Sequence, residues 1–418
     1  MKLHPILSAL RRHKTGVLLI ALQIALTLAI VCNAMFIIGQ RIERVSRPTG
    51  IAENNLIRIA QRWLEAPSGD DPASIDKLDA LQRTDLQTLR SLPDVQEVAA
   101  STSMPIQGAV WSGGLTLTPQ QQGAMNLEVA YYYGDEHLRS TLGLQLIAGR
   151  DFHAGEILHH IINSPAAAPV IIVSKPVADK LFPRGDALGK TVYQEGKPAT
   201  IVGIVERLQT PTLPRLSEPG SSWVYNSVLE PVRLDGAFAS YAVRAKPGRE
   251  QAVMREARKA LLAVNPMREM PDSWGIQPFS EIRAKVYRGD RGMALLMGVI
   301  SLILLCVTAA GIVGLTSFWV GQRRKQIGVR RALGARRIDI LHYFQIENLL
   351  IAGIGVVLGV LLALVINLWL MAHYEMARMP LSYVLMGVLA MLVLGQVAVF
   401  VPARRASNVP PVVATRVA

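Results

Sequence analysis

The 418-residue sequence is poor in cysteine, in charged residues and in aromatic side chains. Two cysteines exclude a disulfide scaffold and any metal module built from several cysteines. Only 18% of the residues are charged and 6% are aromatic, whereas 50% are hydrophobic and the mean hydropathy is +0.29. Disordered chains have the opposite balance, because they cannot bury enough apolar surface to fold. The composition therefore predicts a folded protein with an unusually large share of apolar surface.

Acidic residues are outnumbered, with 31 Asp and Glu against 44 Lys and Arg, for a net charge of +13. The basic excess gathers in three short segments, namely the N-terminal tail, a loop near residue 330 and the C-terminal tail. Each segment lies beside a long hydrophobic run, which is typical of membrane proteins. A nucleic-acid-binding face would need its basic residues on a folded domain with a recognisable motif. The charge pattern therefore excludes nucleic acid as a partner and indicates membrane lipids instead.

Four hydrophobic runs contain no Asp, Glu, Lys or Arg, at residues 17–38, 293–320, 349–370 and 381–401. A helix rises about 1.5 Å per residue, so about 20 residues cross the roughly 30 Å core of a bilayer. We predict transmembrane helices at residues 16–39, 292–320, 349–371 and 381–401. The first run is longer than the apolar part of a signal peptide and no cleavage site follows it, so we expect an uncleaved anchor.

The basic flanks predict the orientation, because cytoplasmic loops of membrane proteins carry an excess of Lys and Arg. The tail at 1–15, the loop at 321–348 and the tail at 402–418 are basic and are predicted to be cytoplasmic. The short loop at 372–380 and the long segment at 40–291 are predicted to lie outside. This describes a multi-pass protein of the inner (plasma) membrane with both termini in the cytoplasm.

Residues 1–15 carry a second pattern. Apolar residues recur there at helical spacing, at Leu3, Ile6, Leu7 and Leu10, and Arg11, Arg12 and Lys14 follow them. This spacing predicts a cytoplasmic amphipathic helix that lies on the membrane surface before the first span.

The long outer segment has a mixed pattern of strands and helices. Strand, helix and strand patterns follow one another within residues 50–104 and again within residues 230–280. Two such units predict a ferredoxin-like α/β subdomain. Residues 105–229 are richer in strands and turns and are predicted to form an inserted, β-rich subdomain. The predicted fold class is thus a four-helix membrane protein with a large extracytoplasmic α/β domain between helices one and two.

No pattern in the chain predicts catalysis, a cofactor or a metal. Gly185-Asp-Ala-Leu-Gly189-Lys-Thr resembles a P-loop, but it has three residues between the glycines where that motif needs four. His153, His159 and His160 lack the spacing of known metal motifs and are expected to be surface histidines. We find no nucleophile elbow and no carboxylate pair. The sequence therefore predicts a non-catalytic protein without a cofactor or metal of its own.

The basic loop at residues 321–348 contains more than positive charge. As a helix it would place Arg323, Arg330 and Arg337, seven residues apart, in one stripe. Gly328, Gly334 and the neighbouring alanines are small enough for another protein to approach closely. The excess of positive charge on cytoplasmic loops explains the arginines but not the small residues. The loop is therefore a candidate docking surface.

The string Ile-Gly-Val-Arg-Arg-Ala-Leu-Gly-Ala-Arg-Arg-Ile-Asp-Ile at 327–340 resembles the loop signature of the MacB/FtsX-type ABC transporter permeases. Stretches at 143–152, 181–190 and 200–205 resemble the MacB-type periplasmic domain, and the placement of one span before it and three after also agrees. Two features depart from the family. Gln326 stands where the family usually has Glu, and this sequence has no fused ATPase domain like that of MacB, so the motor is expected in a separate polypeptide.

The resemblance implies a mechanism called mechanotransmission, in which ATP hydrolysis by a partner moves the outer domain and no substrate passes between the spans. Two permeases, identical copies or paralogues, would each dock on an ABC ATPase subunit that binds ATP and Mg²⁺. The expected coupling residues are Gly328, Arg330, Arg331, Ala332, Leu333, Gly334, Ala335 and Arg336. Arg330 and Arg331 would pair with acidic groups of the ATPase or with lipid phosphates.

Glu347, a single acid at the start of the third span, is a further candidate interface residue. Three roles are open to it, namely contact with the partner, pairing with the loop arginines, or a carboxylate at the membrane surface.

Three functional classes follow from the resemblance. The first is efflux or export through a tripartite assembly with a periplasmic membrane-fusion protein and an outer-membrane channel. The second is an FtsX-like regulator of a cell-wall hydrolase that transports nothing, and the third is LolC/LolE-like extraction of lipoproteins. A stand-alone enzyme is least favoured, because the chain offers no catalytic constellation.

Overall fold

The computed structural model describes residues 14–67, 71–108, 110–119, 126–161, 167–212, 223–374 and 377–408. The chain divides into two compact units. We call the described residues of 14–46 and 289–408 the helical unit, and the described residues of 47–212 and 223–288 the α/β unit. The amphipathic helix predicted at 1–15 falls almost wholly outside the described residues, as does most of the predicted tail at 402–418.

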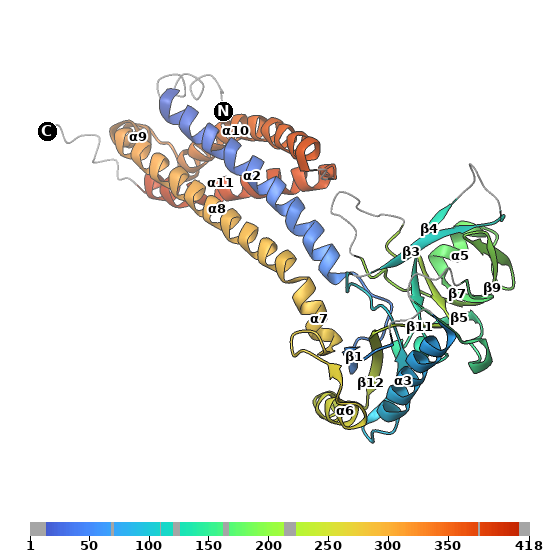
Figure 1. Cartoon of the computed structure of the whole chain (residues 1–418). Coiled ribbons are helices and arrows are strands. Elements are labelled where there is room, and N and C mark those ends of the chain that lie inside the picture. Colours follow the sequence, from blue (N-terminus) through green and yellow to red (C-terminus); the bar gives the residue numbers. More distant parts are fainter. Residues whose placement is uncertain are drawn as a thin grey trace. The chain divides into compact units, whose positions relative to one another are not determined.

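Four long helices form the helical unit (Figure 1), namely α2 (Lys14–Ser46), α8 (Arg288–Gln322), α10 (Arg337–Tyr374) and α11 (Leu381–Ser407). All four are long and apolar enough to cross a membrane. The predicted spans lie within them, and the helices extend past the uncharged runs into charged residues. The short helix α9 (Arg324–Ala332) connects α8 to α10.

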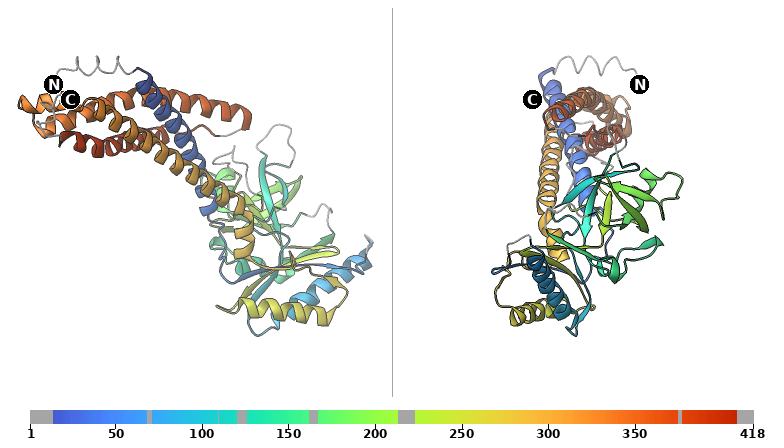
Figure 2. Two further views of the ribbon diagram at one scale, coloured as in Figure 1. Left: turned by 90° about the vertical axis from the view of Figure 1, so that its left-hand side faces the viewer. Right: turned by 45° about the vertical axis from the view of Figure 1, so that its right-hand side comes forward.

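Helix α2 is the centre of this unit, with α10 and α11 packed beside it (Figure 2). Small residues let the backbones approach, as is common between membrane helices. A Cβ atom added to Gly359 of α10 would lie 3.0 Å from Ala25 of α2, and one added to Gly387 of α11 would clash with the sulfur of Cys32. Cys32 is thus a packing residue, whereas Cys306 on α8 is exposed.

Polar side chains join α8 to α2 along much of their length. The hydroxyl oxygens of Thr27 and Thr308 lie 2.8 Å apart, and the Gln23 amide donates to the carbonyl of Val307 over 3.1 Å. At the other end of the pair, Asp290 accepts from Arg41 in an ion pair. Away from these contacts α8 presents exposed apolar side chains, at Leu295, Leu296, Val299, Leu302 and Ile303. Lipid or another apolar helix can cover such a face, because the helix makes its backbone hydrogen bonds internally and needs none from its surroundings.

Among the described residues, the α/β unit contains two large sheets and a two-stranded ribbon, and the first large sheet is built from the two ends of the unit's sequence. Its elements are β1 (Leu56–Trp63), α3 (Pro72–Arg90), β2 (Val95–Ala100), β12 (Phe238–Ala245), α6 (Glu250–Val264), β13 (Arg268–Glu269) and β14 (Ile276–Pro278). The strand order is β13-β1-β12-β2, β14 also pairs with β1, and every pairing is antiparallel. Helices α3 and α6 pack side by side on one face (Figure 2). Ile57, Ile59, Leu86, Leu89 and Tyr241 are buried between the layers.

The second sheet comes from the middle of the chain. Its strands are β3 (Trp111–Thr116), β4 (Leu127–Tyr133), β5 (Leu146–Gly149), β7 (Val170–Ser174), β8 (Thr191–Gln194), β9 (Lys197–Val205) and β10 (Ser227–Glu230). Their order is β5-β9-β7-β10-β4-β3-β8, and β8 also pairs with β9. This last pairing closes six of the strands into a ring, which removes the two open edges of a flat sheet. The sequence predicted that this region is β-rich but not that it closes.

Short elements complete the α/β unit. They are α4 (Leu138–Leu142), a 3₁₀ turn at Ala154–Glu156, β6 (Leu158–Ile161), α5 (Lys175–Leu181), β11 (Val232–Asp235) and α7 (Phe279–Val286). Strands β6 and β11 pair in parallel as a separate ribbon. The charged stretch before the second span is helical in α7, and this helix ends at Val286, before α8 begins at Arg288.

Candidate functional site

The predicted coupling residues lie in the second half of α9 and in the turn that follows it. Gly328 is buried, and Arg331 and Ala335 are half-buried. The other five are exposed, at Arg330, Ala332, Leu333, Gly334 and Arg336. Leu333 is 83% exposed, which is the largest value among the exposed large hydrophobic side chains of the described residues. The eight residues are therefore one continuous surface segment with an apolar side chain at its tip.

Helix α9 is held against the rest of the helical unit on its other side. Ile327 is only 6% exposed and belongs to the apolar core of that unit. The Arg331 guanidinium donates to the carbonyl of Ser407 at the end of α11 over 3.3 Å, and that of Arg330 lies over the ring of Tyr343 on α10, 5.2 Å from its centre. Two of the predicted coupling arginines thus have partners within the chain.

Backbone hydrogen bonds define the turn after α9. The N–H groups of Leu333, Gly334 and Ala335 donate to carbonyls of the last helical turn over 3.0–3.2 Å. Gly334 has a φ of +95°, the left-handed conformation that ends many helices and that favours glycine. The N–H of Arg336 donates to the Asp339 carboxylate over 2.9 Å, which fixes the start of α10. The glycine therefore has a backbone role that the sequence pattern, read only for small size, did not reveal.

Glu347 lies inside the helical unit and is 2% exposed. Both of its carboxylate oxygens accept from Nη1 of Arg323, over 2.9 and 3.0 Å. Of the three roles left open by the sequence, pairing with a loop arginine is the one seen in this geometry. Sequence reasoning did not single out Arg323 and Tyr343 for this site. The available signal was the four-residue spacing of Tyr343 and Glu347, which puts both on one helix face.

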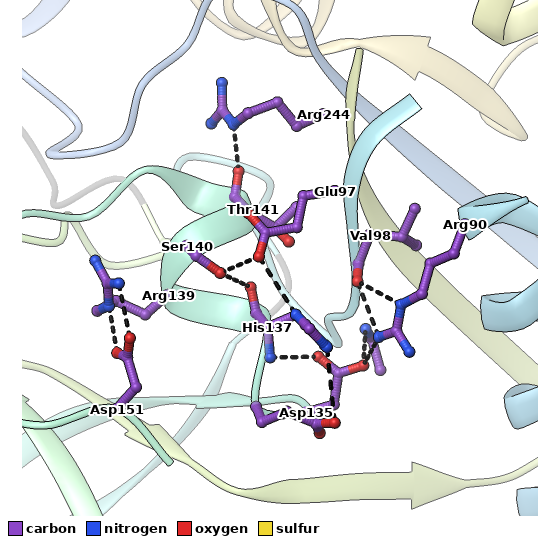
Figure 3. A network of polar contacts seen from close by, with 12 residues as sticks. Arg90, Glu97, Val98, Asp135, His137, Arg139, Ser140, Thr141, Asp151 and Arg244 are labelled. Carbon is purple, nitrogen blue, oxygen red and sulfur yellow. Dashed lines mark hydrogen bonds and ion pairs between the residues drawn. The ribbon is translucent and has the colours of Figure 1, made fainter. Parts of the chain in front are cut away.

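The α/β unit holds a polar network between its two sheets (Figure 3). Glu97 of β2 accepts from the hydroxyl of Ser140 on α4, and Nδ1 of His137 lies 3.3 Å from the same carboxylate oxygen. In a serine hydrolase, the serine is hydrogen-bonded to the histidine that removes its proton. Here the serine donates to the carboxylate instead. The arrangement holds α4 against β2 and does not activate a nucleophile.

Further bonds strengthen this connection. Asp135, which is buried, accepts from Arg90 of α3 over 2.9 Å, and burial raises the pKa of its carboxyl group. Arg244 of β12 donates to the carbonyl of Thr141 in α4 over 2.8 Å (Figure 3). The same guanidinium donates to the carbonyls of Asn54 and Ala52. The network thus joins α4, which follows β4 of the ring, to α3, β2 and β12 of the first sheet.

A second polar cluster contains one of the three histidines. Potential ligand atoms of Asp79, His159 and Asp235 lie within 4.8 Å of one another. Asp79 already accepts from Arg233 over 2.6 Å and from Arg83 over 2.8 Å, so a cation here would have to compete with two guanidinium groups. Burial and the charge of Asp79 raise the pKa of Asp235 to about 6. The cluster links α3 to the β6–β11 ribbon, and His159 is half-buried there, not a plain surface histidine.

Two regions of the chain each match a known protein family. Residues 18–260 match the family described as the MacB-like periplasmic core domain. Residues 298–411 match the family described as the FtsX-like permease C-terminal region, which includes α9 and the turn after it. The first match alone covers more than half of the chain.

Relatives among curated proteins carry the name macrolide export ATP-binding/permease protein MacB. The protein from Neisseria gonorrhoeae is 28% identical over 332 residues, which are 77% of this chain and 48% of that protein. The protein from Pasteurella multocida is 25% identical over 407 residues, 96% of this chain and 58% of that protein. One from Aeromonas hydrophila, MacB 2, is 26% identical over 416 residues, 99% of this chain and 59% of that protein. The chain spans about half the length of these relatives.

Two solved structures are similar to part of the chain. The periplasmic region of MacB from Actinobacillus actinomycetemcomitans matches 58% of this chain and 97% of its own, with 15% identity and a TM-score of 0.34. The extracellular domain of the Gram-positive transporter YknZ matches 53% of this chain and 98% of its own, with 18% identity and a TM-score of 0.32. On the family matches, the chain belongs to the MacB/FtsX-type ABC transporter permeases of the inner membrane.

Proposed function

We propose that this chain is the membrane subunit of a machine driven by an ABC ATPase, and that α9 with the turn after it is where the ATPase docks. The observation that carries the proposal is Leu333. Leu333 is 83% exposed, and Val329 and Ile338, close to it in the sequence, are exposed as well, so a partner that covers this segment would bury apolar surface. The turn that presents it is fixed by hydrogen bonds, so docking does not first have to order a flexible loop.

The charges around Leu333 support an acidic partner surface. Arg330 and Arg336 are exposed on either side of it, and Ala332 and Gly334 leave room for close approach. An apolar contact surrounded by charged residues is the usual anatomy of a protein interface. Arg331 is already bonded to Ser407, so we assign it to holding α9 in place more than to contact with the ATPase.

Several finer features belong to the same proposal. The ATPase binds ATP and Mg²⁺, both chain termini and α9 are cytoplasmic, and the loop before α11 is periplasmic. A second permease, an identical copy or a paralogue, completes the complex. The strand order β14-β1-β12-β2 supports a ferredoxin-like subdomain with residues 105–229 inserted in it. ATP-driven movement at α9 is passed through the helices to this periplasmic domain.

We propose efflux or export as the output, through an assembly with a periplasmic membrane-fusion protein and an outer-membrane channel. Support comes from the names of the relatives, which are macrolide export proteins. No feature of the described residues favours control of a cell-wall hydrolase or lipoprotein extraction over export.

The test is co-purification of the tagged full chain from gently solubilised native membranes, with mass spectrometry of what accompanies it. An ABC ATPase is expected with the unchanged chain and is expected to be lost with Leu333→Asp, because a buried, unpaired charge opposes docking. The matched control is Leu64→Asp, which changes another exposed leucine, in the α/β unit and outside the candidate membrane helices. Absence of any ATPase after crosslinking, or retention with Leu333→Asp, contradicts the proposal.

A further inference from the structure

The connection between α8 and α9 has a feature that docking alone does not require. The two helices meet at Arg323, whose N–H donates to the carbonyl of Trp319 in α8 over 3.0 Å. Its carbonyl accepts from the N–H of Ile327 in α9 over 2.9 Å. One residue therefore belongs to the hydrogen-bonding pattern of both helices, and any bend between them must occur at this residue.

The side chain of Arg323 is bound to a third helix. Its Nη1 donates to both oxygens of Glu347 on α10, and the hydroxyl of Tyr343 lies 3.5 Å away. The guanidinium also lies 5.9 Å from the ring centre of Trp319. The side chains of Arg323 and Glu347 are 13% and 3% exposed, so water does little to weaken their attraction.

A second arginine of the basic stripe also contacts α10. Arg330, seven residues after Arg323, lies over Tyr343, which is one turn before Glu347 on the same face of α10. Helix α9 is thus attached to α10 at both ends, while its backbone continues from α8. A force on α9 cannot bend the α8–α9 connection without separating a buried charge pair.

We propose that Arg323 and Glu347 form a rigid joint that makes α8, α9 and α10 move together, so that both are positioning residues for the transmission of movement. The inference rests on the proposed function for its purpose, but the joint itself can be measured without the ATPase. Its chemistry predicts that the pair tolerates exchange of the two charges better than loss of either one, because the exchange keeps the attraction.

The experiment places a nitroxide label at Ala332→Cys, an exposed position at the end of α9, in the full chain with Cys32→Ala and Cys306→Ala. Label mobility is measured in nanodiscs for Arg323→Glu, Glu347→Arg and the double exchange. The control is Arg324→Glu, which reverses an exposed neighbouring arginine. We expect either single reversal to reduce the immobile fraction of the label, the double exchange to restore most of it, and the control to leave it unchanged.

The joint is overturned if the label is equally mobile in the single-reversal variants and in the unchanged chain. It is also overturned if the label is as mobile in the double exchange as in the single reversals. Should the reversals not fold, Glu347→Gln removes the charge and keeps the shape, and unchanged mobility in that variant also overturns the joint.

A second label separates the joint from the proposed function. Met293→Cys lies near the other end of α8, and in the presence of the partner ATPase its spectrum is expected to change on addition of ATP. This response should disappear in Arg323→Glu and return in the double exchange, while the ATPase still co-purifies. A joint detected at position 332 with no ATP response at position 293 in the unchanged chain contradicts the proposed function and leaves the joint intact.

Discussion

Glu230 is a buried carboxyl group whose protonation affects the stability of the α/β unit. It lies at the end of β10 and is 1% exposed. Burial raises its pKa to about 8, from an ordinary value near 4.5. Near neutral pH the folded protein therefore keeps a proton on Glu230 that the unfolded chain releases.

The sign of the pH dependence follows from this difference. Well below pH 4.5 Glu230 is protonated in both the folded and the unfolded chain, so it does not lower the free energy of unfolding. As the pH rises towards 8, unfolding releases a proton, so the free energy of unfolding falls by up to about 1.4 kcal/mol per pH unit. Glu230→Gln removes this contribution, and we expect its melting temperature to fall less between pH 5 and pH 8 than that of the unchanged chain. The control is Glu128→Gln on the neighbouring strand β4, where the side chain is exposed. If the melting temperature changed equally with pH in all three proteins, the raised pKa of Glu230 would be contradicted.

Gly334 illustrates what sequence can and cannot reveal about a residue. Its small size predicted close approach by a partner, which stays a prediction; within the described part of the chain, an added Cβ atom would meet nothing within 4 Å. Its positive φ depends on where α9 ends. Hydrogen bonds determine that end, and it cannot be predicted from the sequence. Glu347 shows the same limit, because its partner Arg323 is 24 residues away and only the packing of α8 against α10 brings them together.

At the scale of elements, the close approach of α10 to α2 depends on glycine at one position and not at another on the same helix. Leucine at Gly359 would force Ala25 and Leu28 of α2 away, because even a Cβ atom there lies 2.9–3.0 Å from them. An added Cβ atom at Gly353 meets no described residue within 4 Å. We expect Gly359→Leu to lower stability by about 1–3 kcal/mol, the usual cost of overpacking, and Gly353→Leu to change it little.

The measurement is the thermal unfolding of both variants in the same detergent. Similar melting temperatures for the two variants would mean that α10 does not pack against α2 through Gly359.

Long hydrophobic runs made the four membrane helices predictable, because in a bilayer only a helix satisfies every backbone group within the segment. The two strand-helix-strand units were predictable for a similar reason, since their residues alternate or repeat locally. The ring of strands was not. Its closure depends on β8 pairing with β9 on one side and with β3 on the other, and β3 lies far away in the sequence. The break between α8 and α9 was also hidden, because Arg323 is an ordinary helix-forming residue.

At the scale of the whole α/β unit, we expect Arg244 to stabilise the connection between the two large sheets. Its guanidinium donates to three backbone carbonyls, those of Ala52, Asn54 and Thr141. Arg244→Ala leaves these carbonyls without their donor and is expected to cost about 2 kcal/mol locally, as for other bonds to charged groups. Since about 1.4 kcal/mol corresponds to a factor of ten, amide hydrogens of α4 should exchange more than tenfold faster.

Hydrogen–deuterium exchange with mass spectrometry checks this on the full chain. Arg62→Ala, on the adjacent strand β1 with an exposed side chain, is the control. Unchanged protection of α4 in Arg244→Ala would show that the two sheets are joined mainly by other contacts.

The strand order of the first sheet also dictates a sequence of events during synthesis. Among the described residues, β1 pairs with β12, β13 and β14, and β2 pairs with β12, so neither strand has a pairing partner there until the ribosome has passed residue 245. The six-stranded ring needs nothing beyond residue 230 and can fold first. For that interval β1, α3 and β2 are an unfinished half of a sheet with exposed apolar faces. Chaperones that bind unfinished chains should therefore find this N-terminal half, and not the ring, as their principal site on a partly made chain.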